Sequence, residues 1–354
     1  MTLPSPDAPP PPGASRTRPD RSRTVLLGFL TLGVALLAWS LSAVLLMLFG
    51  AVIVAVILHA MAAPLERHLK LKPRPAVAAA VVLALLFLSL LGWLIGDRLT
   101  EQFEDLRERL PSALLALVEW ARGFPIGLAL LELWDSASVG DVPWTRVAYA
   151  ATQTLNAVGT VLLMALVGVY LAIDPRLYRV GLVRLVPPAY RERINEALLA
   201  SGHALSRWLV AQSFSMLFVG ITTAVGLALL NVPLALTLGV IAGLLAFVPF
   251  FGAIAAGVLA VLLAFTQGPT QALYVGLLSL AIQQVEGNVI MPLVERWAVS
   301  LAPALAIMAA VIFGVLFGLP GLVLSTPLMV VTMVLVKKLY VEGFLEAAPP
   351  PAAS

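Results

Sequence analysis

The chain has 354 residues, of which 60% are hydrophobic and 12% are charged. Soluble domains of this size carry about twice that charged fraction, so the composition excludes an ordinary soluble globular protein. The sequence contains no cysteine, which excludes disulfides, thiolate catalysis and thiolate metal sites. We therefore expect an all-α polytopic membrane protein.

Apolar runs follow one another along the chain, and most are near or above the ~20 residues that cross a bilayer as a helix. They cover residues 24–41, 44–62, 75–96, 148–172, 208–230, 233–266, 270–291 and 303–336. The run over 148–172 is followed by Asp174–Pro175, a helix stop. We predict three membrane helices within 24–96, a fourth over 148–172 and a C-terminal bundle over 208–340.

Polar segments separate these runs. Residues 1–23 and 341–354, rich in proline or small residues, are predicted to be disordered tails. Within the acidic segment 97–146, one helical face is apolar, which predicts an amphipathic extension of the third helix. The residues of that face are Leu99, Phe103, Leu106 and Leu110. They would pack either on their own chain or on another subunit.

Charge predicts the orientation. Basic residues concentrate in 1–23, 66–74 and 174–207 and at Lys337–Lys338, and threading the chain through the predicted spans places all four regions on one side. The positive-inside rule makes that side cytoplasmic. The N-terminus and the amphipathic linker 174–207 are then cytoplasmic, and 97–146 is external.

Two runs are too long for one simple crossing, and each is interrupted by proline and glycine. The first breaks at "FVPFFG" (247–252) and the second at "FGLPGLVLSTP" (317–327). Each arm is about 14–17 residues long, or ~21–26 Å, which is short of a full crossing. They resemble re-entrant helical hairpins, although one long kinked helix each is the alternative.

A matched pair of interrupted apolar segments is a sequence pointer to a transport site. Helix breaks inside a membrane leave amide and carbonyl groups that protein or a wet cavity must cover. We therefore predict that the break residues line a solute pathway. They are Phe247, Pro249 and Gly252 at the first break, and Gly318, Pro320, Gly321 and Pro327 at the second.

Glu286 is the only formally charged residue between 208 and 294. An intramembrane carboxylate is a functional candidate by default, and here it could carry a proton or cation. Gln283 lies three residues earlier on the same helical face, and Asn288 is a weaker third candidate. The alternative is that Glu286 reaches the headgroups or pairs with Arg296.

The order Pro233, "FVPFFG", "QQVEGNVIMP", Pro303 and "GLPGLVLSTPL" resembles the autoinducer-2 exporter family, a group of bacterial inner-membrane permeases. The resemblance extends over 24–340 and is most specific at 233–330. It implies about eight membrane segments, as counted above, a homo-oligomer and export of small polar molecules such as a quorum-sensing signal. Some relatives look like sodium–proton antiporters.

Other function classes lack their motifs. No GxxxxGK[ST] phosphate loop is present, so a fused ATPase is not expected, and no HExxH or other metal-ligand spacing occurs. We expect no enzyme activity, cofactor, metal or nucleic-acid partner. The partners would be a small-molecule solute and the lipid bilayer. The rival hypotheses are a sodium–proton antiporter and a membrane scaffold or assembly factor that transports nothing.

Overall fold

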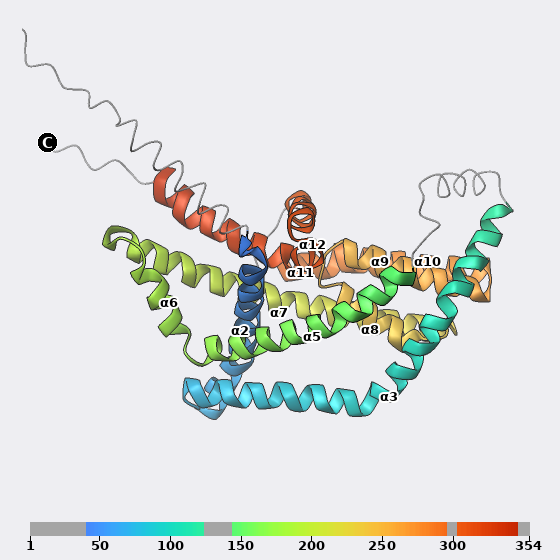
Figure 1. Ribbon diagram of the computed structural model, residues 1–354, viewed down its shortest axis with the longest axis horizontal. Helices are drawn as coiled ribbons and strands as arrows, with labels where there is room; N and C mark the ends of the chain where they lie inside the picture. Colours follow the sequence, from blue (N-terminus) through green and yellow to red (C-terminus); the bar gives the residue numbers. More distant parts are fainter. Residues whose placement is uncertain (1–39, 124–143, 296–302, 346–354) are drawn as a thin grey trace, which may run out of the picture. The chain divides into compact units, whose positions relative to one another are not determined.

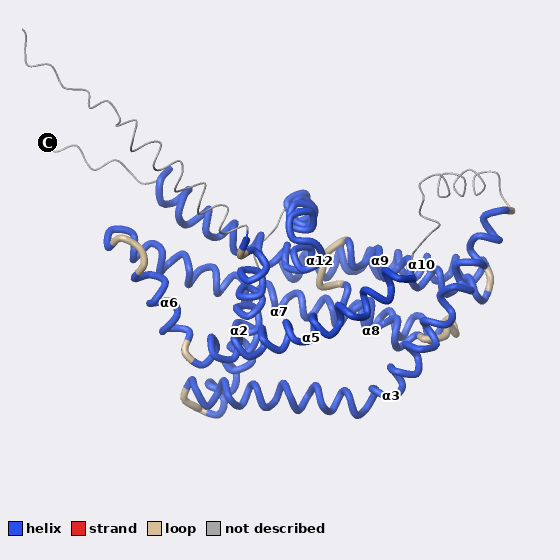
Figure 2. The backbone as a smooth tube through the Cα atoms, viewed as in Figure 1, coloured by secondary structure: helices blue, strands red, loops and turns tan. Residues whose placement is uncertain are grey.

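The computed structural model describes residues 40–123, 144–295 and 303–345. Their backbone is helical, with short connecting turns (Figure 2). The chain divides into two units, Met1–Leu45 and Leu46–Ser354. Of the first unit only the beginning of α2 is described, and the packing given below concerns the second.

Five of the described helices are long and apolar enough to cross a membrane. They lie within Ser42–Leu69, Pro73–Leu90, Pro188–Leu229, Pro269–Leu293 and Ala304–Gly343, and a bent pair around Asp174 makes a sixth candidate. Two shorter apolar helices accompany them. This confirms the prediction of an all-α polytopic membrane protein. The predicted span 24–41 lies outside the described residues, apart from its last two.

The N-terminal helices pack through small residues. α2 (Ser42–Leu69), α3 (Pro73–Arg122) and α5 (Trp144–Ile173) share a core cluster that includes Ala62, Ala76 and Ala172. Small side chains let helix backbones approach closely in a membrane, where packing rather than water exclusion drives association.

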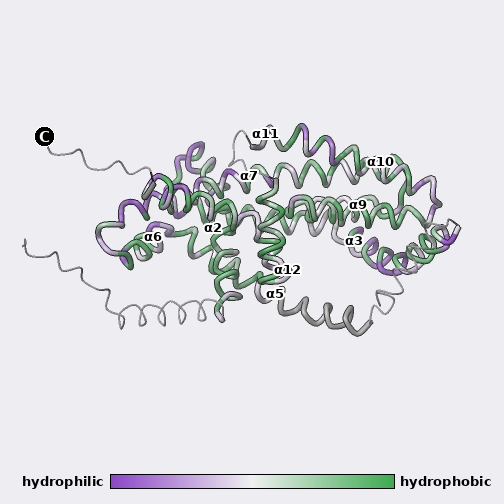
Figure 3. Tube along the Cα trace, turned by 90° about the horizontal axis from the view of Figure 1, so that it is seen from above, coloured by the Kyte–Doolittle hydropathy of each residue, from purple (hydrophilic) through white to green (hydrophobic). Residues whose placement is uncertain are grey.

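α3 is a single helix of 50 residues, so the predicted continuation of the third helix is present as far as Arg122. Leu106 and Ala113 are buried in a cluster with residues of α8 to α10, while Phe103 is 58% exposed. Gln102 accepts hydrogen bonds from the backbone N–H and the hydroxyl of Thr237. Leu106 of the predicted apolar face therefore packs on its own chain, whereas Phe103 leaves part of that face exposed. Figure 3 shows a hydrophilic stretch in α3 after its first, apolar part.

The chain turns sharply after α5. Asp174 caps α6 (Pro175–Arg184) by accepting a hydrogen bond from the N–H of Leu177, and α5 and α6 meet at 87°. After a short 3₁₀ turn, α7 runs without a break from Arg191 to Leu229. The second half of the predicted linker 174–207 thus belongs to the same helix as the fifth span, because no proline interrupts residues 191–229.

The first interrupted run is a helical hairpin. α8 (Ala235–Leu245) and α9 (Phe251–Ala264) lie against each other (Figure 1). The start of α8 and the end of α9 lie close together, since the side-chain amide of Gln267, just after α9, donates a hydrogen bond to the carbonyl of Asn231, just before α8. α8 is only roughly 16 Å long at 1.5 Å per residue, too short to cross a bilayer. The hairpin, not the single kinked helix, is the observed alternative.

Glycine permits the turn of this hairpin. A Cβ atom at Gly252 would lie 1.7 Å from the carbonyl oxygen of Leu245, so no other residue fits without moving the backbone. Phe250, two residues earlier, has a φ of 65°, which is uncommon for a residue other than glycine.

The second interrupted run also turns back. α12 (Pro303–Leu335) is broken at Gly318, whose φ is 67° and ψ −150°. A Cβ at Gly321 would lie 2.1 Å from the carbonyl oxygen of Phe313, which a straight helix would hold two turns away. The π-helical η4 (Val336–Leu345) then continues the chain, so residues 341–345 are helical where a disordered tail was predicted.

Candidate functional site

Two buried polar side chains lie on one face of α7. Gln212 is 4% exposed and Ser215 is 1% exposed, and both are within an apolar stretch of the helix. Residues three apart on a helix point the same way. Each of them meets one of the features that the sequence singled out, the first break and Glu286.

Gln212 holds the first break. Its amide nitrogen donates a hydrogen bond of 2.7 Å to the carbonyl oxygen of Ala246, directly after α8. Carbonyls at the end of a helix have no partner within that helix, and Pro249 offers no N–H to continue the ladder. Gln212 therefore supplies the hydrogen bond that the break removes.

Ser215 holds Glu286. Its hydroxyl donates a hydrogen bond of 2.6 Å to a carboxyl oxygen of Glu286. Glu286 is half-buried and follows α10 (Pro269–Val285), at the start of a five-residue π-helical turn, η3 (Glu286–Ile290). Such turns inside helices occur frequently at functional sites. Glu286 thus faces α7, and its alternative partner Arg296 lies outside the described residues.

Of the two other polar candidates, one lies near this site and one does not. Gln283 is half-buried and lines a space of about 20 Å³ between α7, α8, α9 and α10, together with Thr223 and Ser279. A space of that size holds about one water molecule. Asn288 is exposed and donates instead to the carbonyl and the side-chain oxygen of Gln284.

The two turns share one aromatic and aliphatic cluster. Phe247, from the first turn, meets Trp208 of α7 edge to face, with ring centroids 5.7 Å apart. Phe317, from the second, packs against the same cluster, to which Leu324 and Val330 also belong. The structure therefore brings the two breaks together around α7.

The remaining break residues differ in burial. Gly252, Gly321 and Pro327 are buried and Pro249 is half-buried, whereas Gly318 and Pro320 are exposed. Among the residues that the structure describes, no three His, Asp or Glu side chains gather closely enough to hold a metal ion. What the site offers is one carboxylate, several amide and hydroxyl groups, and an apolar surround.

Sequence reasoning missed Gln212 and Ser215. Both are polar residues inside an apolar run, which is a signal in itself, because buried polar groups in a membrane need partners. The sequence also offers Ser213 and Thr222 in the same run, and these bond back to their own helix at Leu209 and Phe218. Only the packing of α7 distinguishes polar residues that bond to another helix from those that bond back to their own.

The family model of the AI-2E family transporters matches residues 27–340, which include nearly all of the helices described above. The chain belongs to this family. This confirms the resemblance drawn from the broken segments and makes the protein a membrane transporter of the AI-2E family rather than a member of a catalytic family.

Curated relatives agree with this membership. The chain is 24% identical to the candidate transport protein YueF of Bacillus subtilis over 79% of this chain and 81% of the relative. It is 23% identical to YrrI of the same species over 79% of this chain and 83% of that one. A 147-residue stretch is 35% identical to the candidate transport protein MT0215 of Mycobacterium tuberculosis, which is 40% of each chain.

Substituting Gln212→Leu in this AI-2E transporter should lower its stability by about 1–3 kcal/mol, because the carbonyl of Ala246 is left buried without its donor. The midpoint of thermal unfolding in detergent measures this. Gln284→Leu is the control, because Gln284 is exposed and its hydrogen bond from Asn288 lies on an exposed face, so the midpoint should shift little. Equal midpoints for the two variants would contradict the role given to Gln212.

Proposed function

We propose that this protein transports a small polar solute across the bacterial inner membrane, without an ATPase of its own, along a pathway formed by α7, the α8–α9 hairpin and α10. That the protein is a transporter follows from its family membership, whereas the solute and the pathway are our proposal. The observation that carries it is the pair on α7, in which Gln212 binds the first break and Ser215 binds Glu286.

The physical argument concerns polar groups at membrane depth. An uncovered carbonyl or amide there costs several kcal/mol, so a break survives where protein or water covers it. At the first break, the cover is a side-chain amide, which a solute with its own donors can replace. Hydrogen bonds to Gln212, Ser215, Gln283 and Glu286 are then the means of recognising a polar molecule.

Movement is needed for passage. The space beside Gln283 holds about one water molecule. A larger solute passes only when the α8–α9 hairpin separates from α7 and α10. Both turns pack on the Trp208 cluster of α7, and we propose that the two hairpins shift together over this shared surface, while the N-terminal helices serve as scaffold. The homo-oligomer implied by the resemblance would be assembled through that scaffold.

Two contacts support the predicted orientation. Arg74 pairs with Asp174 at 3.0 Å, which joins the basic loop 66–74 to the basic linker 174–207. Arg193 donates to the carbonyl of Gly343, which joins that linker to the end of the chain near Lys337–Lys338. Regions predicted to lie on the cytoplasmic side are therefore in contact, as the proposed orientation requires.

Flux measurements test the proposal. The full chain is reconstituted in liposomes with a pH-sensitive dye, and a panel of small polar solutes is assayed with and without sodium. We expect an organic solute to cross. Proton movement that requires sodium, with no organic flux, would instead establish the antiporter, which the carboxylate of Glu286 favours. No movement of any kind would support the scaffold and contradict transport.

A further inference from the structure

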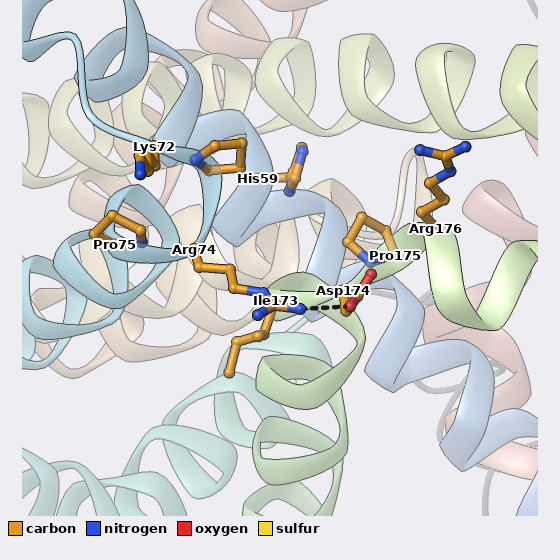
Figure 4. Close-up of a pocket in the computed structure, with 9 residues that line it drawn as sticks. His59, Lys72, Arg74, Pro75, Ile173, Asp174, Pro175 and Arg176 are labelled. Carbon is orange, nitrogen blue, oxygen red and sulfur yellow. Dashed lines mark hydrogen bonds and ion pairs between the residues drawn. The ribbon is translucent and has the colours of Figure 1, made fainter.

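A second site lies away from the pathway, at the corner where α2, the start of α3 and the α5–α6 junction meet. A cavity of about 510 Å³ opens there, within the size range of ligand pockets in proteins. Figure 4 shows Arg74 reaching from the start of α3 to Asp174, with Lys72 on one side of this pair, Arg176 of α6 on the other, and His59 of α2 between them.

The lining of this cavity is positively charged. Lys72, Arg74 and Arg176 contribute three cations, and Asp174 is the one carboxylate among the described residues that line it. Counting lysine, arginine and aspartate, the lining carries a formal net charge of +2. Arg74 is paired with Asp174, but its side chain is 74% exposed, so it remains accessible to a ligand.

Two helices begin beside this cavity. α3 begins at Pro73, and its N-cap Lys72 makes no side-chain capping hydrogen bond. α6 begins at Pro175 on the other side of the cavity. The N-terminus of a helix attracts anions through its uncapped N–H groups and its dipole. However, Asp174 already caps α6, and Pro73 and Pro75 supply no N–H at the start of α3, so it is the cations and the cavity that favour a negatively charged ligand.

The position and the apolar walls indicate which anion. The cavity is next to Pro73, where a candidate membrane span begins, and its wall includes Ile173 and three prolines. Basic pockets between membrane helices on the cytoplasmic side suit the head groups of anionic lipids. A phosphate with acyl chains attached can use both the cations and the apolar wall, whereas free phosphate uses only the cations.

We propose that this cavity binds the phosphate of an anionic membrane lipid, held by Lys72, Arg74 and Arg176. The choice of a lipid rests on the proposed orientation, but the site is separate from the proposed pathway, so it stands whether or not the solute route is correct. A lipid bound there would tie the α2–α3 loop to the α5–α6 corner, alongside the Arg74–Asp174 ion pair.

The test uses the full chain in detergent with three probes: phosphatidylglycerol, phosphatidylcholine and inorganic phosphate. Native mass spectrometry measures the lipid retained. Phosphatidylglycerol should bind in preference to phosphatidylcholine, and millimolar phosphate should not displace it. The double substitution Lys72→Gln/Arg176→Gln should weaken phosphatidylglycerol binding about 30-fold. The matched control is Arg67→Gln/Arg184→Gln, which removes two exposed cations outside the cavity and should leave binding unchanged.

A second variant is expected to strengthen lipid binding, which misfolding would not do. Asp174→Asn keeps a side chain that can cap α6, releases Arg74 and removes the one carboxylate. Phosphatidylglycerol should then bind about fivefold more tightly. Equal binding of the two lipids, or an unchanged affinity in both the double variant and Asp174→Asn, would overturn the proposal. If inorganic phosphate displaced bound phosphatidylglycerol as effectively as added phosphatidylglycerol does, the ligand of the cavity would be free phosphate and not a lipid.

Discussion

Substituting Glu286→Gln is expected to abolish ion-coupled flux while leaving the fold largely intact. Glutamine keeps a side-chain oxygen that can accept the hydrogen bond from Ser215, so the contact between α7 and η3 survives. It cannot take up or release a proton, and it carries no charge to bind a cation. If Glu286 couples transport to an ion, this one change removes the coupling and little else.

The measurement is flux into liposomes across a range of pH, with and without a sodium gradient. Glu119→Gln is the matched control, because Glu119 is an exposed glutamate on α3 and should leave flux unchanged. Full flux with an unaltered pH profile in Glu286→Gln would show that the carboxylate has no coupling role. Solute flux that persists but no longer depends on the ion would separate coupling from passage.

Substituting Gly252→Ala should destabilise the protein by about 3 kcal/mol or more, the upper range for overpacking a close contact. The added methyl would lie 1.7 Å from the carbonyl oxygen of Leu245, so the turn between α8 and α9 has to open. Gly321→Ala should act in the same way at the second turn, where the distance to the carbonyl oxygen of Phe313 is 2.1 Å.

Thermal unfolding in detergent compares these variants with Gly257→Ala. Gly257 is in α9 like Gly252, but an added methyl there would meet Ser279 at 3.7 Å, an ordinary contact. We expect this control to change stability by less than about 0.5 kcal/mol. A midpoint for Gly252→Ala equal to that of Gly257→Ala would mean that the hairpin turn does not need glycine.

The parts of the fold that the sequence predicted are local. Apolar length predicted the membrane helices, and proline and glycine predicted where α8 ends and where α12 breaks at Gly318. The end of α5 before Asp174–Pro175 was predicted in the same way. Where the sequence has no such local signal, prediction was weaker: charge density separated the linker 174–207 from the fifth span, but α7 continues through both.

The candidate site shows the same division. Glu286 and Gln283 stood out as polar residues in an apolar run, and the structure places both beside α7 or the space next to it. Asn288 was the weaker candidate, because it is not on the helical face of Gln283 and Glu286, and in the structure it bonds to Gln284 on an exposed face. Their roles in transport remain predictions.

By itself, the sequence determined that this is a membrane protein with two broken segments, because hydrophobicity, a missing proline N–H and a missing glycine Cβ act within a few residues. Only the tertiary structure decided that Gln212 binds Ala246, 34 residues away, and that Ser215 binds Glu286, 71 residues away. Such pairs depend on which faces of α7, α8 and α10 meet. That is settled by the packing of whole helices, for which a single sequence carries no local mark.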